Sequence, residues 1–506
     1  MIDLHQGPQE RAGLSCAMGF SSNPPRGVTS LPPIIQGGMG IGVSNWRLAR
    51  AVAQAGQLGV VSGTALNTIL IRRLHQGDVD GEMRQALSAC PLKAAAGRIQ
   101  ARYFIPAGKP AAQRHRLSPM FAASSPEDLV ELTIVANFVE VYLAKRGHAG
   151  VVGLNLLEKV QLPTLPSLFG AMLAGVDCVL MGAGIPRGIP GALDALAAWR
   201  PAELDLAIAD AAPGAKHRLH FNPAAYCPEV KPPLQRPVFL AIVSSSTLAT
   251  TLARKASGHV DGFVVEGLSA GGHNAPPRGP MTLSSKGEPV YGPRDVADLT
   301  AIRALGRPFW LAGSYASPAK LSEARALGAA GVQIGTAFAF CEESGLDPAL
   351  KRTVLEQSAK GATTLFTDPR ASPTGMPFKV VDIAGTVSRE EVYARRSRTC
   401  DLGYLRQPYQ RADGTIGYRC PAEPVDDYVQ KGGDAADAVG RKCLCNGLLA
   451  AIGLGQALAG DTTEPAIVTA GEDVSEIARF LPVGQRSYSA ADVLAFVLAA
   501  STQSAP

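Results

Sequence analysis

The stretch PIIQGGMGIGVSNWRLARAVAQAGQLGVV, residues 33–61, contains the pattern that decides the fold. Two short apolar runs, residues 33–35 and 58–61, flank a segment whose apolar residues recur at helical spacing. Gly37 and Gly38 form a turn after the first run, and the side chain of Asn45 can cap the helix that follows. The stretch therefore predicts a strand, a helix and a second strand parallel to the first.

The same alternation of apolar runs and alanine-rich segments continues to about residue 345. Two longer segments, residues 77–150 and 190–236, break it and are expected to be insertions, the first with a helix near Leu129 to Lys145. Six more apolar runs predict strands, at residues 151–156, 178–181, 238–243, 262–266, 308–312 and 332–335. Eight parallel strands joined by helices predict an α/β fold, a closed TIM (β/α)8 barrel.

This pattern divides the chain into three parts. Residues 1–30 contain charged residues and prolines but no apolar segment of the secretory type, and they predict an N-terminal tail. Residues 31–345 form the predicted barrel. Residues 346–506 lack the alternation and predict an appended, mainly helical region with loops, which ends in an amphipathic helix at residues 490–500.

Composition limits the functional class of the protein. Charged residues make up only 18% of the 506 residues and hydrophobic residues 46%, which indicates a globular protein with a large core. With 48 basic and 43 acidic residues and no basic arm, we expect no nucleic-acid partner. The most apolar run, residues 169–186, contains Asp177 and several glycines, so we expect no membrane span. Nine irregularly spaced cysteines favour reduced thiols and a cytoplasmic protein, and a homo-oligomer is left open.

Glycine turns follow the seventh and eighth predicted strands, where TIM barrels often hold a phosphate group. Strand seven ends in Gly313 and Ser314, and strand eight in Gly335 and Thr336. Backbone N–H groups and hydroxyls at such turns suit a phosphate dianion. Each turn by itself is also typical of an ordinary strand end.

The sixth predicted strand leads into the sequence EGLSAGGH, residues 266–273. Its glycines allow a ligand to approach the backbone, and His273 follows at the mouth of the barrel. Histidine titrates near neutral pH and is suited to proton transfer. Its position after a strand end and a double glycine makes His273 the candidate catalytic base.

Four motifs, in this order, resemble the nitronate monooxygenases, formerly called 2-nitropropane dioxygenases, and their relatives, the flavin-dependent enoyl-ACP reductases. The motifs are IIQGGM at residues 34–39, GLN at 153–155, AGGH at 270–273 and GVQIGT at 331–336. The resemblance covers roughly residues 31–345. It implies an FMN-dependent oxidoreductase.

The resemblance also implies roles for the matching residues. His273 corresponds to the family's catalytic histidine, which removes the proton α to a nitro group or assists oxidation of the nitronate anion. FMN and O2 complete a reaction that yields a carbonyl compound and nitrite. The flavin ring would be lined by Gln36, Gly37, Gly38 and Met39, with a polar contact from Asn155, and the ribityl chain and phosphate would be held by Gly271, Gly313, Gln333, Gly335 and Thr336.

Two positions depart from the family pattern. The family often has glutamine where this chain has Glu266, and its double glycine after strand seven is Gly313-Ser314 here. Glu266 near the ring could repel an anionic nitronate or form an ion pair with Arg278. Flavin binding is still expected, with Glu266, Gly272 and Ser314 among the contacts, whereas the substrate is left open.

Two further readings are kept beside nitronate oxidation. The first is an NAD(P)H-dependent FMN enoyl reductase acting on acyl thioesters in fatty acid or polyketide biosynthesis, where long relatives occur. Barrel motifs alone do not separate these two activities. The second is a non-catalytic barrel or metal-bearing interaction module, which would lack bound flavin and leave the strand-end motifs without a purpose.

The segment that follows His273 predicts a hairpin with residues 286–288 at its turn. It is either a lid over the site or a surface feature.

The C-terminal region contains four cysteines that could ligate zinc or an iron–sulfur cluster. Their spacing matches no usual CxxC pair, so we expect buried thiols and no metal. They are Cys400, Cys420, Cys443 and Cys445.

Overall fold

Eight parallel strands form a closed barrel in the computed structural model, which describes residues 27, 31–226, 232–459 and 462–499. Their order is β1-β10-β9-β8-β7-β4-β3-β2, and a parallel bridge between Ile35 and Leu58 joins the two outer strands. The TIM-barrel prediction is confirmed. The strands are β1 (Ile34–Gln36), β2 (Gly59–Ser62), β3 (Val152–Leu157), β4 (Cys178–Gly182), β7 (Val238–Val243), β8 (Gly262–Glu266), β9 (Phe309–Ala312) and β10 (Gly331–Ile334).

Alternate residues of these strands face two different cores. Val60, Leu240 and Trp310 are buried in a small cluster that fills the barrel, whereas their neighbours Val61 and Phe239 belong to the large core beneath the helices. This alternation explains why the runs are apolar throughout, because both faces of a parallel sheet are covered.

Helices surround the barrel, and several begin at caps that the sequence provides. The side chain of Asn45 accepts the N–H of Leu48 at 2.9 Å to start α1. Ser245 and Ser317 cap α8 and α10 in the same way. The surrounding helices include α1 (Trp46–Gln54), α2 (Leu66–His75), α6 (Thr164–Leu173), α7 (Ile189–Ala197), α8 (Ser246–Lys255), α9 (Leu299–Arg303) and α10 (Pro318–Ala326).

The two predicted insertions carry elements of their own. Within residues 77–150 lie α3 (Glu82–Ala89), α4 (Lys93–Tyr103) and the predicted long helix, α5 (Glu127–Lys145). Residues 190–236 contain the hairpin of β5 (Ala202–Leu206) and β6 (His217–Phe221).

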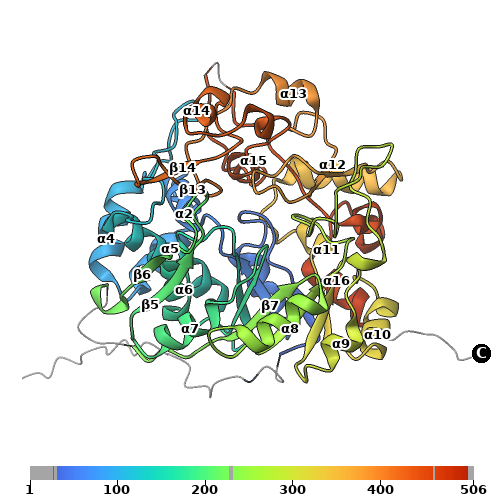
Figure 1. Cartoon of the computed structure of the whole chain (residues 1–506). Helices are drawn as coiled ribbons and strands as arrows, with labels where there is room; N and C mark the ends of the chain where they lie inside the picture. The colour runs from blue at the N-terminus through green and yellow to red at the C-terminus, as the bar shows by residue number, and fades with distance from the viewer. Residues whose placement is uncertain (1–26, 28–30, 227–231, 460–461, 500–506) are drawn as a thin grey trace, which may run out of the picture.

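The chain beyond residue 345 covers one end of the barrel and then joins its helical ring. Figure 1 shows α13, α14 and α15, in orange to red, together over the barrel, while α16 lies among the barrel helices. The region also holds two antiparallel hairpins, β11 with β12 and β13 with β14. Its elements are α12 (Pro348–Ala359), β11 (Leu365–Asp368), β12 (Phe378–Val381), α13 (Glu390–Arg395), β13 (Gln407–Gln410), β14 (Ile416–Arg419), α14 (Val425–Gln430), α15 (Leu444–Ala450), the 3-10 segment η5 (Glu472–Phe480) and α16 (Ala490–Leu498).

Helix α16 occupies the place of a missing barrel helix. The segment after β10, α11 (Thr336–Ala339), has only four residues and cannot cover the last strand. Instead α16 packs against α1 and α10, and its Val493, Leu494 and Val497 are buried in the large core. The predicted amphipathic helix therefore completes the ring around the barrel.

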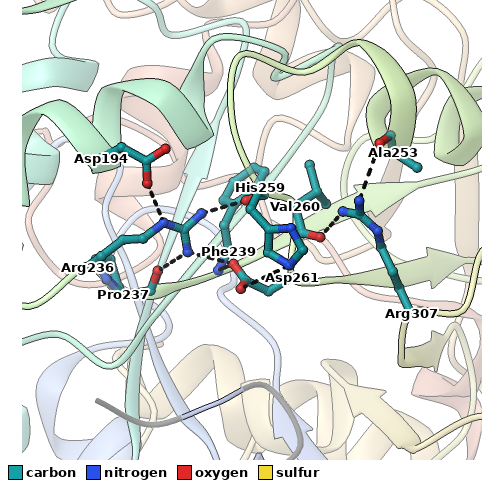
Figure 2. A network of polar contacts seen from close by, with 9 residues as sticks. All are labelled: Asp194, Arg236, Pro237, Phe239, Ala253, His259, Val260, Asp261 and Arg307. Atoms are coloured by element: carbon teal, nitrogen blue, oxygen red, sulfur yellow. Dashed lines mark hydrogen bonds and ion pairs between the residues drawn. The ribbon is translucent and has the colours of Figure 1, made fainter. Parts of the chain in front are cut away.

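A polar network ties the N-terminal ends of β7, β8 and β9 together. Figure 2 shows Arg236 between Asp194 and Asp261, with both ion pairs at 2.7 Å. Asp261 also accepts the N–H of Phe239 at 2.8 Å, and Arg307 donates to the carbonyl of Val260. The network lies at the end of the barrel opposite the strand-end motifs. In TIM barrels, residues at this end contribute to stability, whereas the active site lies at the other end.

The predicted tail, residues 1–30, lies outside the described residues except for Gly27. Among the residues that are described, we find no helix with the length and apolar character needed to cross a membrane.

Candidate active site

A cavity of about 220 Å³ lies at the C-terminal ends of the barrel strands. The ends of β1, β3, β8, β9 and β10 all contribute to its wall. Thus the structure brings together nearly every residue that the sequence singled out. The cavity is lined by Gly37, Gly38, Met39, Asn155, Glu266, Gly271, Gly272, His273, Gly313, Ser314, Gln333, Gly335 and Thr336.

Gln36 is the expected site residue that does not line this cavity. Its side chain is fully buried in the barrel wall, where Nε2 donates to Ser44 Oγ at 2.9 Å and Oε1 accepts the N–H of Val60 at 2.9 Å. Ser44 Oγ in turn donates to the carbonyl of Gly37 and accepts the N–H of Met39. Gln36 therefore fixes the shape of the glycine turn from behind.

The glycine turn leaves room for Asn155. The Asn155 amide donates to the carbonyl of Gly38 at 3.0 Å, and a Cβ atom on Gly38 would lie only 2.2 Å from the Asn155 Cβ. A larger residue at position 38 would thus displace Asn155 from the cavity.

Three buried polar atoms on the cavity wall have no hydrogen-bond partner. They are Oδ1 of Asn155, Oγ of Ser314 and Oε1 of Gln333. Buried polar atoms are nearly always paired in proteins, so each such orphan calls for an explanation. Three of them in one cavity indicate that it binds a polar ligand.

The turn after β9 is held in an uncommon backbone conformation. Gly313 and Ser314 have φ angles of +105° and +57°, in the region that side chains other than glycine rarely adopt. Such a conformation in a serine costs about 1–2 kcal/mol and is concentrated at ligand sites. Ser314, where the family pattern has a second glycine, therefore adopts a strained conformation at the cavity wall.

The hydroxyl of Thr336 is already engaged by the C-terminal region. It accepts the N–H of Gly471 at 2.9 Å and is also hydrogen-bonded to the carboxyl of Asp473, whose pKa is raised by burial. The lining, as far as the structure describes it, contains no lysine or arginine. A phosphate group here would depend on backbone N–H groups and hydroxyls.

His273 is held by groups that lie about a hundred residues further along the chain. Its Nε2 is hydrogen-bonded to Oγ of the buried Ser372 at 2.7 Å, and the edge of its ring contacts Phe378, with centroids 4.9 Å apart. The backbone is fixed as well, because Lys379 N–H donates to the carbonyl of Gly272 at 3.0 Å. Burial lowers the pKa of His273 to about 4, so the imidazole is neutral at neutral pH.

Comparisons with known proteins agree with these motifs. The model of a family described as nitronate monooxygenase matches residues 223–418, which include His273 and Ser372. A probable nitronate monooxygenase of Bacillus subtilis is 37% identical over 132 residues, 26% of this chain and 36% of that protein. Over these segments the chain is similar to nitronate monooxygenases.

Other relatives and neighbours have different names. A Mycobacterium tuberculosis protein named as a (3aS,4S,5R,7aS)-5-hydroxy-7a-methyl-1-oxo-octahydro-1H-indene-4-carboxyl-CoA dehydrogenase is 32% identical over 142 residues, 28% of this chain and 35% of that one. The solved nitroalkane oxidase of Streptomyces ansochromogenes has a TM-score of 0.43 at 16% identity and covers 93% of this chain and 96% of its own. The sequence matches span only about a third of the length of the curated relatives.

Glu266, which replaces the glutamine common in nitronate monooxygenases, lies at the end of β8 on the cavity wall. Burial raises the pKa of its carboxyl to about 7. The ion pair with Arg278 that we considered is not present between these described residues: Arg278 is exposed, and its N–H donates to Asp295 Oδ1 at 2.7 Å.

The hairpin after His273 is formed, with Ser284 N–H donating to the carbonyl of Glu288 at 2.8 Å. The carboxyl of Glu288 accepts the N–H of Thr367 at 2.8 Å, which attaches the hairpin to β11. Its described residues do not line the cavity. In this conformation the hairpin lies beside the C-terminal region instead of closing the site.

The far wall of the cavity comes from the C-terminal region, which sequence reasoning did not place. Residues 444–473 lie beyond the segment matched by the nitronate monooxygenase model. Their loops and short helix carry no periodic pattern that points to a barrel mouth. This wall is mostly apolar and includes Leu444, Leu448, Ile467 and Val468.

Proposed function

We propose that the protein is an FMN-dependent oxidoreductase that oxidises alkyl nitronates with O2 to a carbonyl compound and nitrite, with His273 as its base. The observation that best supports this proposal is the cavity at the strand ends, whose lining combines a neutral imidazole with three orphaned polar atoms. A base must lie within reach of the proton that it removes, and a neutral imidazole is ready to accept one.

The residues of this cavity fit FMN. Oδ1 of Asn155 and Oε1 of Gln333 are unpaired acceptors, which suit the N–H of a flavin ring and the hydroxyls of a ribityl chain. The absence of a side chain at Gly38 keeps space open beside Asn155. When bound, FMN supplies the electron acceptor that O2 later regenerates.

His273 would hold the proton taken from a nitroalkane. If Ser372 accepts the Nε2 proton, Nδ1 remains as the basic nitrogen. The buried Ser372 and the ring of Phe378 fix the imidazole plane, which reduces the entropic cost of reaching the reactive geometry.

The test begins with the visible spectrum of the purified chain. Anaerobic bleaching of a flavin band by propyl nitronate, and not by NADPH or NADH, supports the proposal. Absence of any bound flavin would reject both it and the FMN assignment. His273→Ala should keep the flavin colour and lose roughly 10²- to 10⁴-fold in turnover of a neutral nitroalkane, whose α-proton the base removes, which is the usual contribution of a general base.

Reduction or oxidation of an acyl thioester is the second candidate. It is favoured by the relative named as a carboxyl-CoA dehydrogenase and by the apolar wall of the C-terminal region. Bleaching by a nicotinamide alone, followed by reoxidation with an enoyl thioester, would establish this candidate in place of nitronate oxidation.

A further inference from the structure

The turn between β11 and β12, which carries Ser372, is held by a residue from a distant part of the chain. Arg441, which precedes α15, donates from Nη1 to the carbonyl of Ser372 at 2.6 Å and to the carbonyl of Arg370 at 3.0 Å. Its Nε donates to the carbonyl of Asp437 at 2.9 Å. The guanidinium therefore joins the turn to the segment that leads into α15.

The chemistry of these contacts calls for an arginine. The three acceptors are backbone carbonyls, and a hydrogen bond from a charged donor is stronger than one from a neutral donor. A guanidinium presents its donors in a fixed planar fork, which lets it bridge carbonyls from two segments at once. The ammonium group of a lysine is a point charge on a flexible stem and does not reproduce this fork.

Lys442 attaches the same turn at a second place. Its N–H donates to the carbonyl of Ala371 at 2.9 Å, and its ammonium group pairs with Asp368 at 3.1 Å. Asp368 also accepts the N–H of Ala371 at 3.0 Å. Of these attachments, that of Arg441 reaches the backbone of Ser372 itself.

The position of the Ser372 backbone decides the contact with His273. Ser372 Oγ accepts the N–H of Thr374 at 3.2 Å and shares hydrogen bonds with Thr374 Oγ1 at 2.8 Å and with His273 Nε2 at 2.7 Å. Hydrogen bonds weaken steeply as their geometry departs from the optimum. A turn that moved would therefore loosen the imidazole and let water reach it.

We propose that Arg441 is a positioning residue for the candidate base, because it fixes the backbone of Ser372 and thereby holds the imidazole of His273 in its reactive orientation. Arg441 does not line the candidate active site, so it acts through Ser372 and not on the substrate. The catalytic part of this inference rests on the proposed role of His273. Its structural part holds for any substrate.

The direct test is NMR of the full chain labelled with ¹³C-histidine, with His273→Ala used to assign the signal. Burial lowers the pKa of His273 to about 4, so the wild-type signal should remain that of a neutral imidazole from about pH 5.5 to about pH 7. In Arg441→Ala, water reaches the ring and His273 should titrate closer to its ordinary pKa of about 6.5. This measurement needs neither flavin nor substrate.

Kinetics provide the second readout. In Arg441→Ala we expect kcat to fall about tenfold, with KM and flavin content nearly unchanged, as for the loss of one hydrogen bond that orients the base. Added guanidinium should restore part of the activity and of the neutral signal, whereas methylammonium should not. The matched control is Arg419→Ala, which removes a guanidinium that donates to two carbonyls outside this turn, those of Lys431 and Gly432, and it should change neither readout.

An unchanged His273 signal in folded Arg441→Ala would overturn the inference, and so would an equal change in Arg419→Ala. If Arg441→Ala fails to fold, Arg441→Lys takes its place, because it keeps the charge and loses the fork. An unchanged His273 signal in Arg441→Lys would overturn the inference as well. Absence of flavin or of all activity in the wild-type chain would instead reject the proposed function, and the NMR titration would still decide whether Arg441 positions His273.

Discussion

Ser372 is the side chain through which the C-terminal region acts on the candidate base. Ser372→Ala removes the 2.7 Å hydrogen bond to His273 Nε2 without adding bulk to a fully buried position. We expect kcat/KM to fall about tenfold, as for the loss of one hydrogen bond of about 1–1.5 kcal/mol, with flavin content unchanged. Ser358→Ala, at another buried serine outside the cavity, is the matched control and should keep full activity.

Two cavity groups should shape the pH profile of activity. His273, with a pKa of about 4, becomes able to accept a proton above that pH. Glu266, with a pKa raised to about 7, is neutral below that pH and anionic above it, where it repels an anionic substrate. We therefore expect kcat/KM to rise through pH 4 and to fall above pH 7.

The variant Glu266→Gln separates the two limbs of this profile. It keeps the shape of the side chain but cannot ionise, so activity should persist above pH 7 while the acid limb stays in place. An alkaline limb that is unchanged in Glu266→Gln would assign the loss of activity to another group.

Single residues differ in how far the sequence reveals them. His273 and the glycine turns could be predicted because they directly follow apolar strands within motifs. Ser372 could not, because its contact with His273 joins positions 99 residues apart and a lone serine has no distinctive pattern. Gln36 was assigned to the right turn, but only packing shows that its side chain points into the barrel wall.

The strands were predictable because each is a short apolar run with both faces buried. The cavity wall formed by residues 444–473 could not be predicted from the sequence. Its loops have no periodic sequence pattern, and their positions depend on distant contacts. One such contact is the carbonyl of Gly447, which accepts the N–H of Ile467 at 3.0 Å.

The network of Figure 2 should matter for stability and not for catalysis. Arg236 joins Asp194, Asp261 and two backbone carbonyls from three parts of the chain. Arg236→Met leaves the partly buried Asp261 without its cation and should lower the free energy of unfolding by about 1–3 kcal/mol. Urea denaturation measures this free energy of unfolding. As a control, Arg218→Met removes a more exposed ion pair and should change the free energy of unfolding by less than about 1 kcal/mol.

The molecule as a whole depends on α16 to finish the ring of barrel helices. Leu494→Ala deletes a side chain that is only 4% exposed and should destabilise the entire barrel by about 2–5 kcal/mol. Leu498→Ala, in the same helix but 44% exposed, should have little effect. This role is supported if the protein unfolds in a single cooperative thermal transition whose midpoint temperature falls in Leu494→Ala and not in Leu498→Ala. Loss of α16 signals alone, with the barrel intact, would contradict it.

This arrangement also sets an order of events during synthesis. The first strand and α1 leave the ribosome early, yet the helix that packs against α1 comes from residues 490–498. Nascent chains usually fold domain by domain from the N-terminus. Here the apolar face of α1 that packs against α16 stays exposed until almost the whole sequence shown has been translated. A stalled or prematurely terminated chain would therefore display that face to chaperones and proteases, which can recognise it as incomplete.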